Sequence, residues 1–193
     1  NEKLDQVVLD KMQIGAGSTL NLEKWEEFVF KLKNPENEVN IGLVGKYIEL
    51  KDSYKSIIES FIHAGATTKT KVNLRMINAE TLNETTVVDE LKGLKGILVA
   101  SGFGERGFEG KVKAINYARE NKIPFLGICL GMQCAIVEFA RNVLGFKDAN
   151  STEVDPKTPF PVIDLMKDQK KIRAKGGTMR LGAYTCRLTE GSK

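Results

Sequence analysis

The chain has 193 residues, of which 41% are hydrophobic, and a net charge of +4 from 29 basic and 25 acidic residues. This is enough for one domain with a hydrophobic core and an additional segment. No basic tract occurs and no run of 18 apolar residues occurs, so we expect neither nucleic-acid binding nor a membrane span. The first residues lack the pattern of a secretory signal, and we expect a cytoplasmic protein.

The N-terminal residues, 1–37, differ from the rest and are interpreted as an interdomain linker segment. Trp25, Phe28, Val29 and Leu32 are spaced i, i+3, i+4, i+7. This spacing predicts an amphipathic helix over residues 21–34, which ends before Pro35. Such a helix is expected to dock on another surface.

From residue 38 onward, predicted strands and helices alternate. The strands are predicted over 39–45, 71–77, 96–100 and 124–128, and the helices over 52–65, 84–94, 109–121 and 130–145. Alternation of this kind predicts an α/β fold, with an open parallel sheet covered by helices on both faces.

After Gly145 the pattern weakens. We expect a loop over 148–162, a short strand over 162–166, and a Gly-rich turn entering a strand over 176–188. The sequence stops in a polar turn, so residues 38–193 are interpreted as one domain that is truncated at its C-terminus.

One cysteine stands in an unusual frame, Gly127-Ile128-Cys129-Leu130-Gly131, between a predicted strand and a predicted helix. This matches the nucleophile elbow, with sulfur in place of a serine oxygen. The start of the helix would stabilise a thiolate, and the Leu130 N–H would be available to an oxyanion. The alternative is that Cys129 is a small buried side chain.

The other two cysteines are interpreted as structural. Cys134 falls in the middle of a predicted helix and Cys186 in a strand-like run. Three unclustered cysteines predict neither a disulfide framework nor a zinc site, and no metal ligands are proposed.

A catalytic thiolate also needs a general base. The single histidine, His63, lies near the end of a predicted helix, where a structural use is favoured. Either the base lies outside this chain, or the chain is not catalytic by itself.

A glycine-rich loop over 99–110 lies between a predicted strand and a predicted helix, with glycines at 102, 104, 107 and 110. Its N–H groups could bind an anion or oxyanion, the alternative being a plain flexible turn. A dinucleotide-binding site and a Walker phosphate loop are not indicated, because neither motif occurs.

Five motifs together, "LVGKYIELKDSYKS", "GFGERGFEGK", "PFLGICLGMQ", "DANSTE" and "GGTMRLGA", resemble the class I (triad-type) glutamine amidotransferase domain of the CTP synthase family. The resemblance runs from about Val39 to the end, and the predicted helix over 21–34 resembles that family's linker. It implies a flavodoxin-like open parallel sheet and glutamine hydrolysis at a cysteine. Ammonia would pass to a synthetase domain of the same polypeptide, absent from these 193 residues, which uses ATP and Mg²⁺ to aminate UTP to CTP.

The resemblance also implies roles for individual residues. Cys129 matches the nucleophile, and the N–H groups of Gly102 and Leu130 match the oxyanion hole. Gln133 and Glu153 match residues that bind L-glutamine. Three further residues lie in segments that the family associates with the effector GTP, namely Phe103, Arg106 and Arg180. The family further implies a homotetramer and no cofactor within this chain.

Two departures from the family pattern qualify these expectations. Ser101 stands where the family has a glycine, which puts the geometry of the oxyanion loop in question. The family's His-x-Glu pair and an arginine for the glutamine carboxylate do not occur in these residues, so we expect the chain alone to be inactive. An elbow-cysteine hydrolase of another family and a non-catalytic nucleotide-binding or assembly module remain as alternatives.

Overall fold

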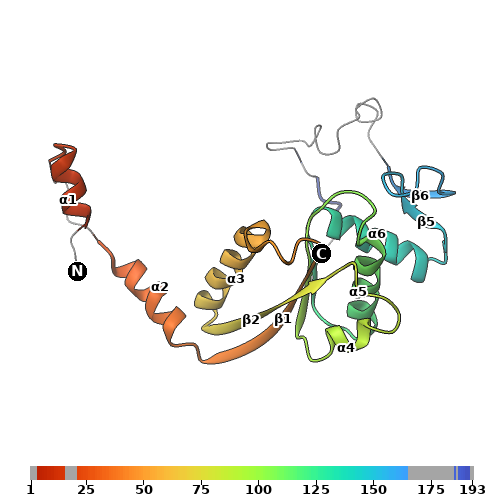
Figure 1. The fold of residues 1–193 in the computed structure, drawn as a ribbon, viewed down its shortest axis with the longest axis horizontal. Helices are drawn as coiled ribbons and strands as arrows, with labels where there is room; N and C mark the ends of the chain where they lie inside the picture. Colours follow the sequence, from red (N-terminus) through yellow and green to blue (C-terminus); the bar gives the residue numbers. More distant parts are fainter. Residues whose placement is uncertain (1–3, 16–20, 165–184, 186, 192–193) are drawn as a thin grey trace. The chain divides into compact units, whose positions relative to one another are not determined.

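The computed structural model describes residues 4–15, 21–164, 185 and 187–191 of the chain. The chain forms two compact units, the first made of residues 1–38 and 56–72 and the second of residues 39–55 and 73–193. Figure 1 shows the helices and strands along the chain. The predicted limits of the linker segment, 1–37, and of the domain, 38–193, stay a prediction.

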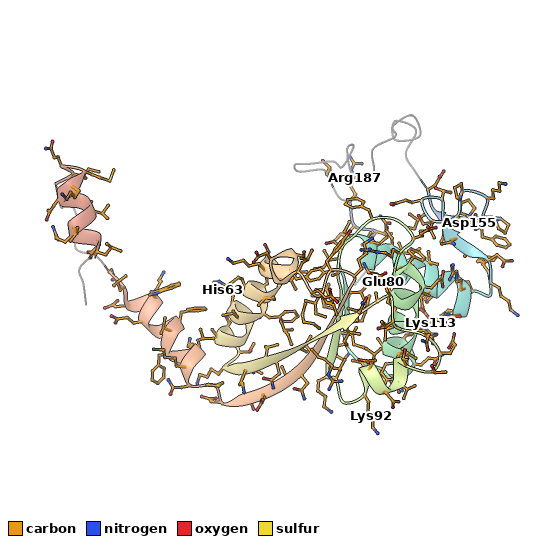
Figure 2. The ribbon with its side chains drawn as sticks, in the orientation of Figure 1. His63, Glu80, Lys92, Lys113, Asp155 and Arg187 are labelled. Carbon is orange, nitrogen blue, oxygen red and sulfur yellow. The ribbon has the colours of Figure 1, made fainter. Side chains whose placement is uncertain are left out.

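The first unit contains helices α1 (Leu4–Lys11) and α2 (Glu23–Lys33) and nearly all of α3 (Lys55–Thr67). The predicted helix over 21–34 is confirmed as α2, whereas α1 was not predicted. His63, which is labelled in Figure 2, lies on α3. The centre of the Phe28 ring lies 5.1 Å from that of the His63 ring and 5.4 Å from that of the Trp25 ring. Trp25 is nevertheless 60% exposed, so much of the apolar surface of α2 is open in this chain.

The second unit is built on a sheet with strand order β2-β1-β3-β4. These strands are β1 (Asn37–Gly45), β2 (Thr70–Asn78), β3 (Gly96–Val99) and β4 (Phe125–Gly127). β3 pairs in parallel with β1 from Ile41↔Gly96 onward, and β4 pairs in parallel with β3. This strand order is the flavodoxin-like one, and the predicted α/β fold class is confirmed.

The helices of this unit are η1 (Lys51–Tyr54), α4 (Val87–Leu91), α5 (Phe108–Glu120) and α6 (Leu130–Asn142). The helix predicted over 84–94 is only five residues long. Its predicted start is wrong because the Asn83 side chain accepts hydrogen bonds from the N–H groups of Thr85 and Thr86, which holds a turn there. Gly93, with φ of +79°, is incompatible with a longer helix.

The loop predicted over 148–162 is wrong in part. Strands β5 (Ala149–Ser151) and β6 (Phe160–Ile163) form a separate parallel pair. β5 has only three residues, too few to show an alternating pattern of apolar and polar residues. Pro161 in β6 argued against a strand, but proline, which has no N–H to donate, is tolerated in a strand at the edge of a sheet. The predicted strand over 162–166 therefore begins earlier, and its last two residues lie outside the described part.

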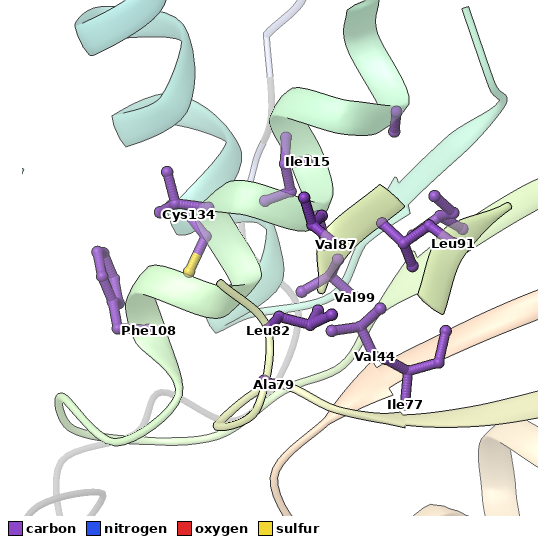
Figure 3. Close-up of a cluster of buried hydrophobic side chains, with 14 of the residues drawn as sticks. Val44, Ile77, Ala79, Leu82, Val87, Leu91, Val99, Phe108, Ile115 and Cys134 are labelled. Carbon is purple, nitrogen blue, oxygen red and sulfur yellow. The ribbon is translucent and has the colours of Figure 1, made fainter. Parts of the chain in front are cut away.

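The core of the second unit lies among the sheet, α4, α5 and α6, and Figure 3 shows part of it. Phe108, Val44 and Cys134 are among its fully buried side chains, so the prediction that Cys134 belongs to the core is confirmed. α5 and α6 are also joined by an ion pair, in which Arg119 lies 3.0 Å from the buried carboxylate of Glu138. α6 is thus held at a defined position over the sheet, with its N-terminus at the end of β4.

Candidate active site

Cys129 occupies the sharp turn between β4 and α6. It is the N-cap residue of α6, with φ of 54° and ψ of −109°, and its side chain is exposed. Positive φ is strained for a residue with a Cβ, and such strain concentrates at functional sites. The carboxyl ends of parallel strands meet at one edge of the sheet, so this turn lies beside the loop after β3. The Ile128 N–H, just before the turn, donates a hydrogen bond of 3.0 Å to the carbonyl of Val99 at the end of β3.

The two glycines of the frame are required by packing. A Cβ on Gly127 would lie 2.6 Å from the backbone of Gly131 and Met132, and one on Gly131 would lie 2.1 Å from the carbonyl oxygen of Val99. Both distances are far inside van der Waals contact. The helix can therefore begin this close to the strands only with glycine at both positions, which leaves Cys129 projecting outward at the turn.

The N-terminus of α6 faces this turn. Leu130 is the first residue of the helix, and its own side chain is buried. N–H groups in the first turn of a helix have no partner within the helix, and they carry the positive end of its dipole. The arrangement can stabilise a thiolate at Cys129 and a developing oxyanion next to it.

The loop after β3 brings Gly102 to the same place. The position of a Cβ on Gly102 lies 3.6 Å from the Leu130 side chain, so these two predicted oxyanion residues are neighbours. The Ala100 N–H bonds to the carbonyl of Val44 at 2.9 Å, which ties the loop to the sheet. Ser101, the departure from the family, is exposed and has no positive φ, so its Cβ is accommodated without strain.

Two lysines that were not predicted as site residues hold this loop. Lys111 of α5 donates to the carbonyls of Ala100 and Ser101, and Lys46, after β1, donates to the carbonyl of Phe103. Both lysines are buried. Lys111 was detectable in the sequence, because it lies three residues after Phe108 and four before Ile115, on the apolar face of its helix.

Glu153, in the turn after β5, reaches the same loop. Its Oε1 accepts a hydrogen bond of 2.8 Å from the Gly104 N–H. Gln133, four residues after Cys129, lies in the first turn of α6, where its N–H donates to the carbonyl of Cys129 at 3.1 Å, and it is half-buried. The structure thus gathers Cys129, Leu130, Gln133, Gly102 and Glu153 around one edge of the sheet.

Comparison with known proteins agrees with this geometry. The family model for glutamine amidotransferase class-I matches residues 49–193. The chain belongs to the class-I glutamine amidotransferase family.

Relatives of this amidotransferase are CTP synthases. The chain is 58% identical over 192 residues to that of Caldanaerobacter subterraneus subsp. tengcongensis and 60% identical over 191 residues to that of Flavobacterium psychrophilum. The first match covers 100% of this chain and the second covers 99% of it, but the chain spans only 36% of the length of either relative. The glutaminase domain of Trypanosoma brucei CTPS with bound acivicin superimposes with a TM-score of 0.64 and 36% identity, over 71% of this chain and 52% of that chain.

Two of the three predicted effector residues, Phe103 and Arg106, lie in the same loop of the amidotransferase. Arg106 is 57% exposed, stands 5.6 Å from the centre of the Tyr47 ring and pairs with Glu80 at 3.3 Å. The Phe103 side chain is exposed as well. Arg180 lies outside the described residues.

The remaining candidates from the sequence are His63 and Cys186. His63 belongs to the first unit, where it contacts Phe28. Cys186 lies outside the described part. In that part no three His, Cys, Asp or Glu side chains are grouped to hold a metal ion, and no helix is long and apolar enough to cross a membrane.

Proposed function

We propose that this chain hydrolyses the side-chain amide of L-glutamine as the glutaminase part of a CTP synthase. The Cys129 thiolate attacks the amide carbon, and the N–H groups of Gly102 and Leu130 bind the oxyanion. The C–N bond then breaks, and the amide nitrogen leaves as ammonia with the proton that the general base took from the Cys129 thiol, which gives a glutamyl thioester. Water attacks the thioester, so glutamate is released and the thiol is restored.

The observation that carries this proposal is the strained, exposed Cys129 at the start of α6 in a chain of the class-I family. Glu153 supports it, because a carboxylate that accepts the Gly104 N–H on one oxygen can accept the α-ammonium group of glutamine on the other. Gln133 lies one helical turn after Cys129 and would bind the substrate beside it.

The general base of the reaction is proposed to come from residues other than these 193. The sole histidine of the sequence is His63, whose ring contacts Phe28 in the first unit. We therefore expect the chain alone to turn glutamine over orders of magnitude more slowly than the complete polypeptide.

The relatives also bear on the fate of the ammonia. Because they are named CTP synthases and are nearly three times longer than this chain, we propose that a synthetase domain of the same polypeptide uses ATP and Mg²⁺ to aminate UTP, within a homotetramer in the cytoplasm. Arg106, Phe103 and Arg180 are proposed to bind the effector GTP. The exposed Phe103 ring can stack on a purine, and the guanidinium group of Arg106 can bind phosphate.

The test of the proposed chemistry uses the full-length protein. Replacing Cys129 with alanine is expected to abolish glutamine-dependent formation of CTP and to leave ammonia-dependent formation intact, since free ammonia bypasses the site. Cys134→Ala is the matched control and should retain both routes. Equal glutamine-dependent rates in the wild type and Cys129→Ala would refute the proposed function.

The effector proposal has its own test. Arg106→Ala should raise the GTP concentration that gives half-maximal stimulation of glutamine hydrolysis, whereas Lys113→Ala, on the surface of α5, should not change it. An unaltered GTP dependence in Arg106→Ala would contradict the proposed role.

A further inference from the structure

Lys111 is a buried cation in the second unit. Its exposed fraction is 0%, and its Nζ lies 2.7 Å from the carbonyl oxygen of Ala100 and 3.3 Å from that of Ser101. Taking an ammonium group out of water is costly, and a methionine of similar shape would fill the space without that cost. The residue therefore requires an explanation other than packing.

The two carbonyls belong to the loop that precedes Gly102. The Ser101 carbonyl and the Gly102 N–H are parts of the same peptide group, which is planar and trans, so they point in opposite directions. A cation bonded to the Ser101 oxygen therefore fixes the direction of the Gly102 N–H. It also polarises the peptide group, which strengthens that N–H as a donor.

Burial and nearby charged groups shift the pKa of Lys111. Burial lowers this pKa, negative charge on the Cys134 sulfur raises it, the ammonium group of Lys46 lowers it, and negative charge on the Cys129 sulfur raises it. Lys111 Nζ lies 3.5 Å from the position of a Cβ on Gly102, and the Leu130 side chain lies 3.6 Å from the same position. The ammonium group is thus next to Gly102 and Leu130, the residues of the predicted oxyanion hole.

We propose that Lys111 is a positioning residue for glutamine hydrolysis, which holds the 101–102 peptide so that the Gly102 N–H points at the oxyanion. The proposal rests on the proposed function of Cys129. Lys46 and Glu153 fix the 103–104 peptide in the same way, because Lys46 donates to the carbonyl of Phe103 and Glu153 accepts from the N–H of Gly104. Lys111 is the anchor for the peptide on which the oxyanion donor itself lies.

The test compares Lys111→Met with Lys113→Met in the full-length protein. Lys113 is on the same helix, and its ammonium group pairs with Glu84 at the surface. In Lys111→Met we expect kcat for glutamine hydrolysis to fall about 100-fold with KM changed less than about threefold, because an oxyanion donor acts in the transition state. Lys113→Met should match the wild type, and CTP formation from free ammonia should persist in both variants.

Three results would overturn this role. Equal kcat values in the two variants would show that Lys111 does not position the loop. A rise in KM alone would show that it serves substrate binding, and parallel loss of the glutamine and ammonia routes would show that it serves only the fold. A Cys129→Ala protein that still uses glutamine would instead refute the proposed function, whatever Lys111→Met does.

Discussion

Two described cysteines, Cys129 at the N-cap of α6 and Cys134 within that helix, lie five positions apart and occupy opposite environments. Cys129 is exposed on a strained turn at the N-terminus of the helix, whereas Cys134 is completely buried in the core. Burial raises the pKa of Cys134 to about 12. The comparison shows that the position of the backbone decides whether a thiol here is exposed or buried, since the residue type is the same.

The largest expected effect concerns the close packing that creates this difference. Gly131→Ala would place a Cβ 2.1 Å from the Val99 carbonyl oxygen, so α6 would have to move away from β3. We expect the free energy of unfolding to fall by about 3 kcal/mol, measured by urea denaturation, together with loss of the exposed Cys129 turn.

Gly145→Ala is the control for that substitution. Gly145 has φ of +82° and no atom within 4 Å of a Cβ position, so only backbone strain of about 1 kcal/mol is expected. An equal loss of the free energy of unfolding in Gly131→Ala and Gly145→Ala would show that contact with Val99 is not the reason why position 131 requires glycine.

Alkylation tests the contrast between the two thiols directly. Iodoacetamide at pH 8 should modify Cys129 at least about 100-fold faster than Cys134, because only the former is exposed next to the positive end of a helix dipole. Peptide mapping by mass spectrometry gives both rates in one sample. Similar rates would mean that the elbow does not activate its cysteine.

The pH dependence of the free energy of unfolding tests the burial of the Cys134 thiol. The folded-state pKa of Cys134 is raised from 9.0 to about 12, so the stability gained from its protonated form is complete below pH 9 and is lost as the pH rises toward 12. At pH 10.5 this loss amounts to about 2 kcal/mol at most. Cys134→Ala should therefore lose less stability between pH 8.5 and 10.5 than the wild type, and an identical slope would contradict the burial of the thiol.

The smallest effect concerns strain at the turn. Cys129→Gly should be more stable toward urea than Cys129→Ala, by about 1 kcal/mol, because glycine accepts φ of 54° without a Cβ penalty. An alanine variant as stable as the glycine variant would show that the elbow carries no strain.

The parts of the molecule that short sequence patterns determine were predicted well. The alternation of strands and helices gave the parallel sheet, and glycines on both sides of Cys129 gave the turn, because both depend on residues close in the chain. The missed parts depend on distant contacts. The place of Lys111 on an apolar helix face is visible in the sequence, but its role depends on its bonds to the loop after β3. Strand β5 is defined by its pairing with β6.

The predicted site residues divide in the same way. The resemblance to the family predicted that Gly102 and Leu130 lie together at the oxyanion hole, and in the structure these two residues are neighbours. The bond between Glu153 and Gly104 joins residues 49 positions apart, and no local pattern reveals it. The length of α4 was misjudged because the side-chain bonds of Asn83 compete with the helix.

Because of the hydrogen bond from the Gly104 N–H, the Glu153 side chain has two roles. The carboxylate proposed to recognise the amino end of the substrate also steadies the loop proposed to carry the reaction. A change at position 153 would therefore disturb selectivity and turnover at once, and evolution could retune one only by compensating for the other.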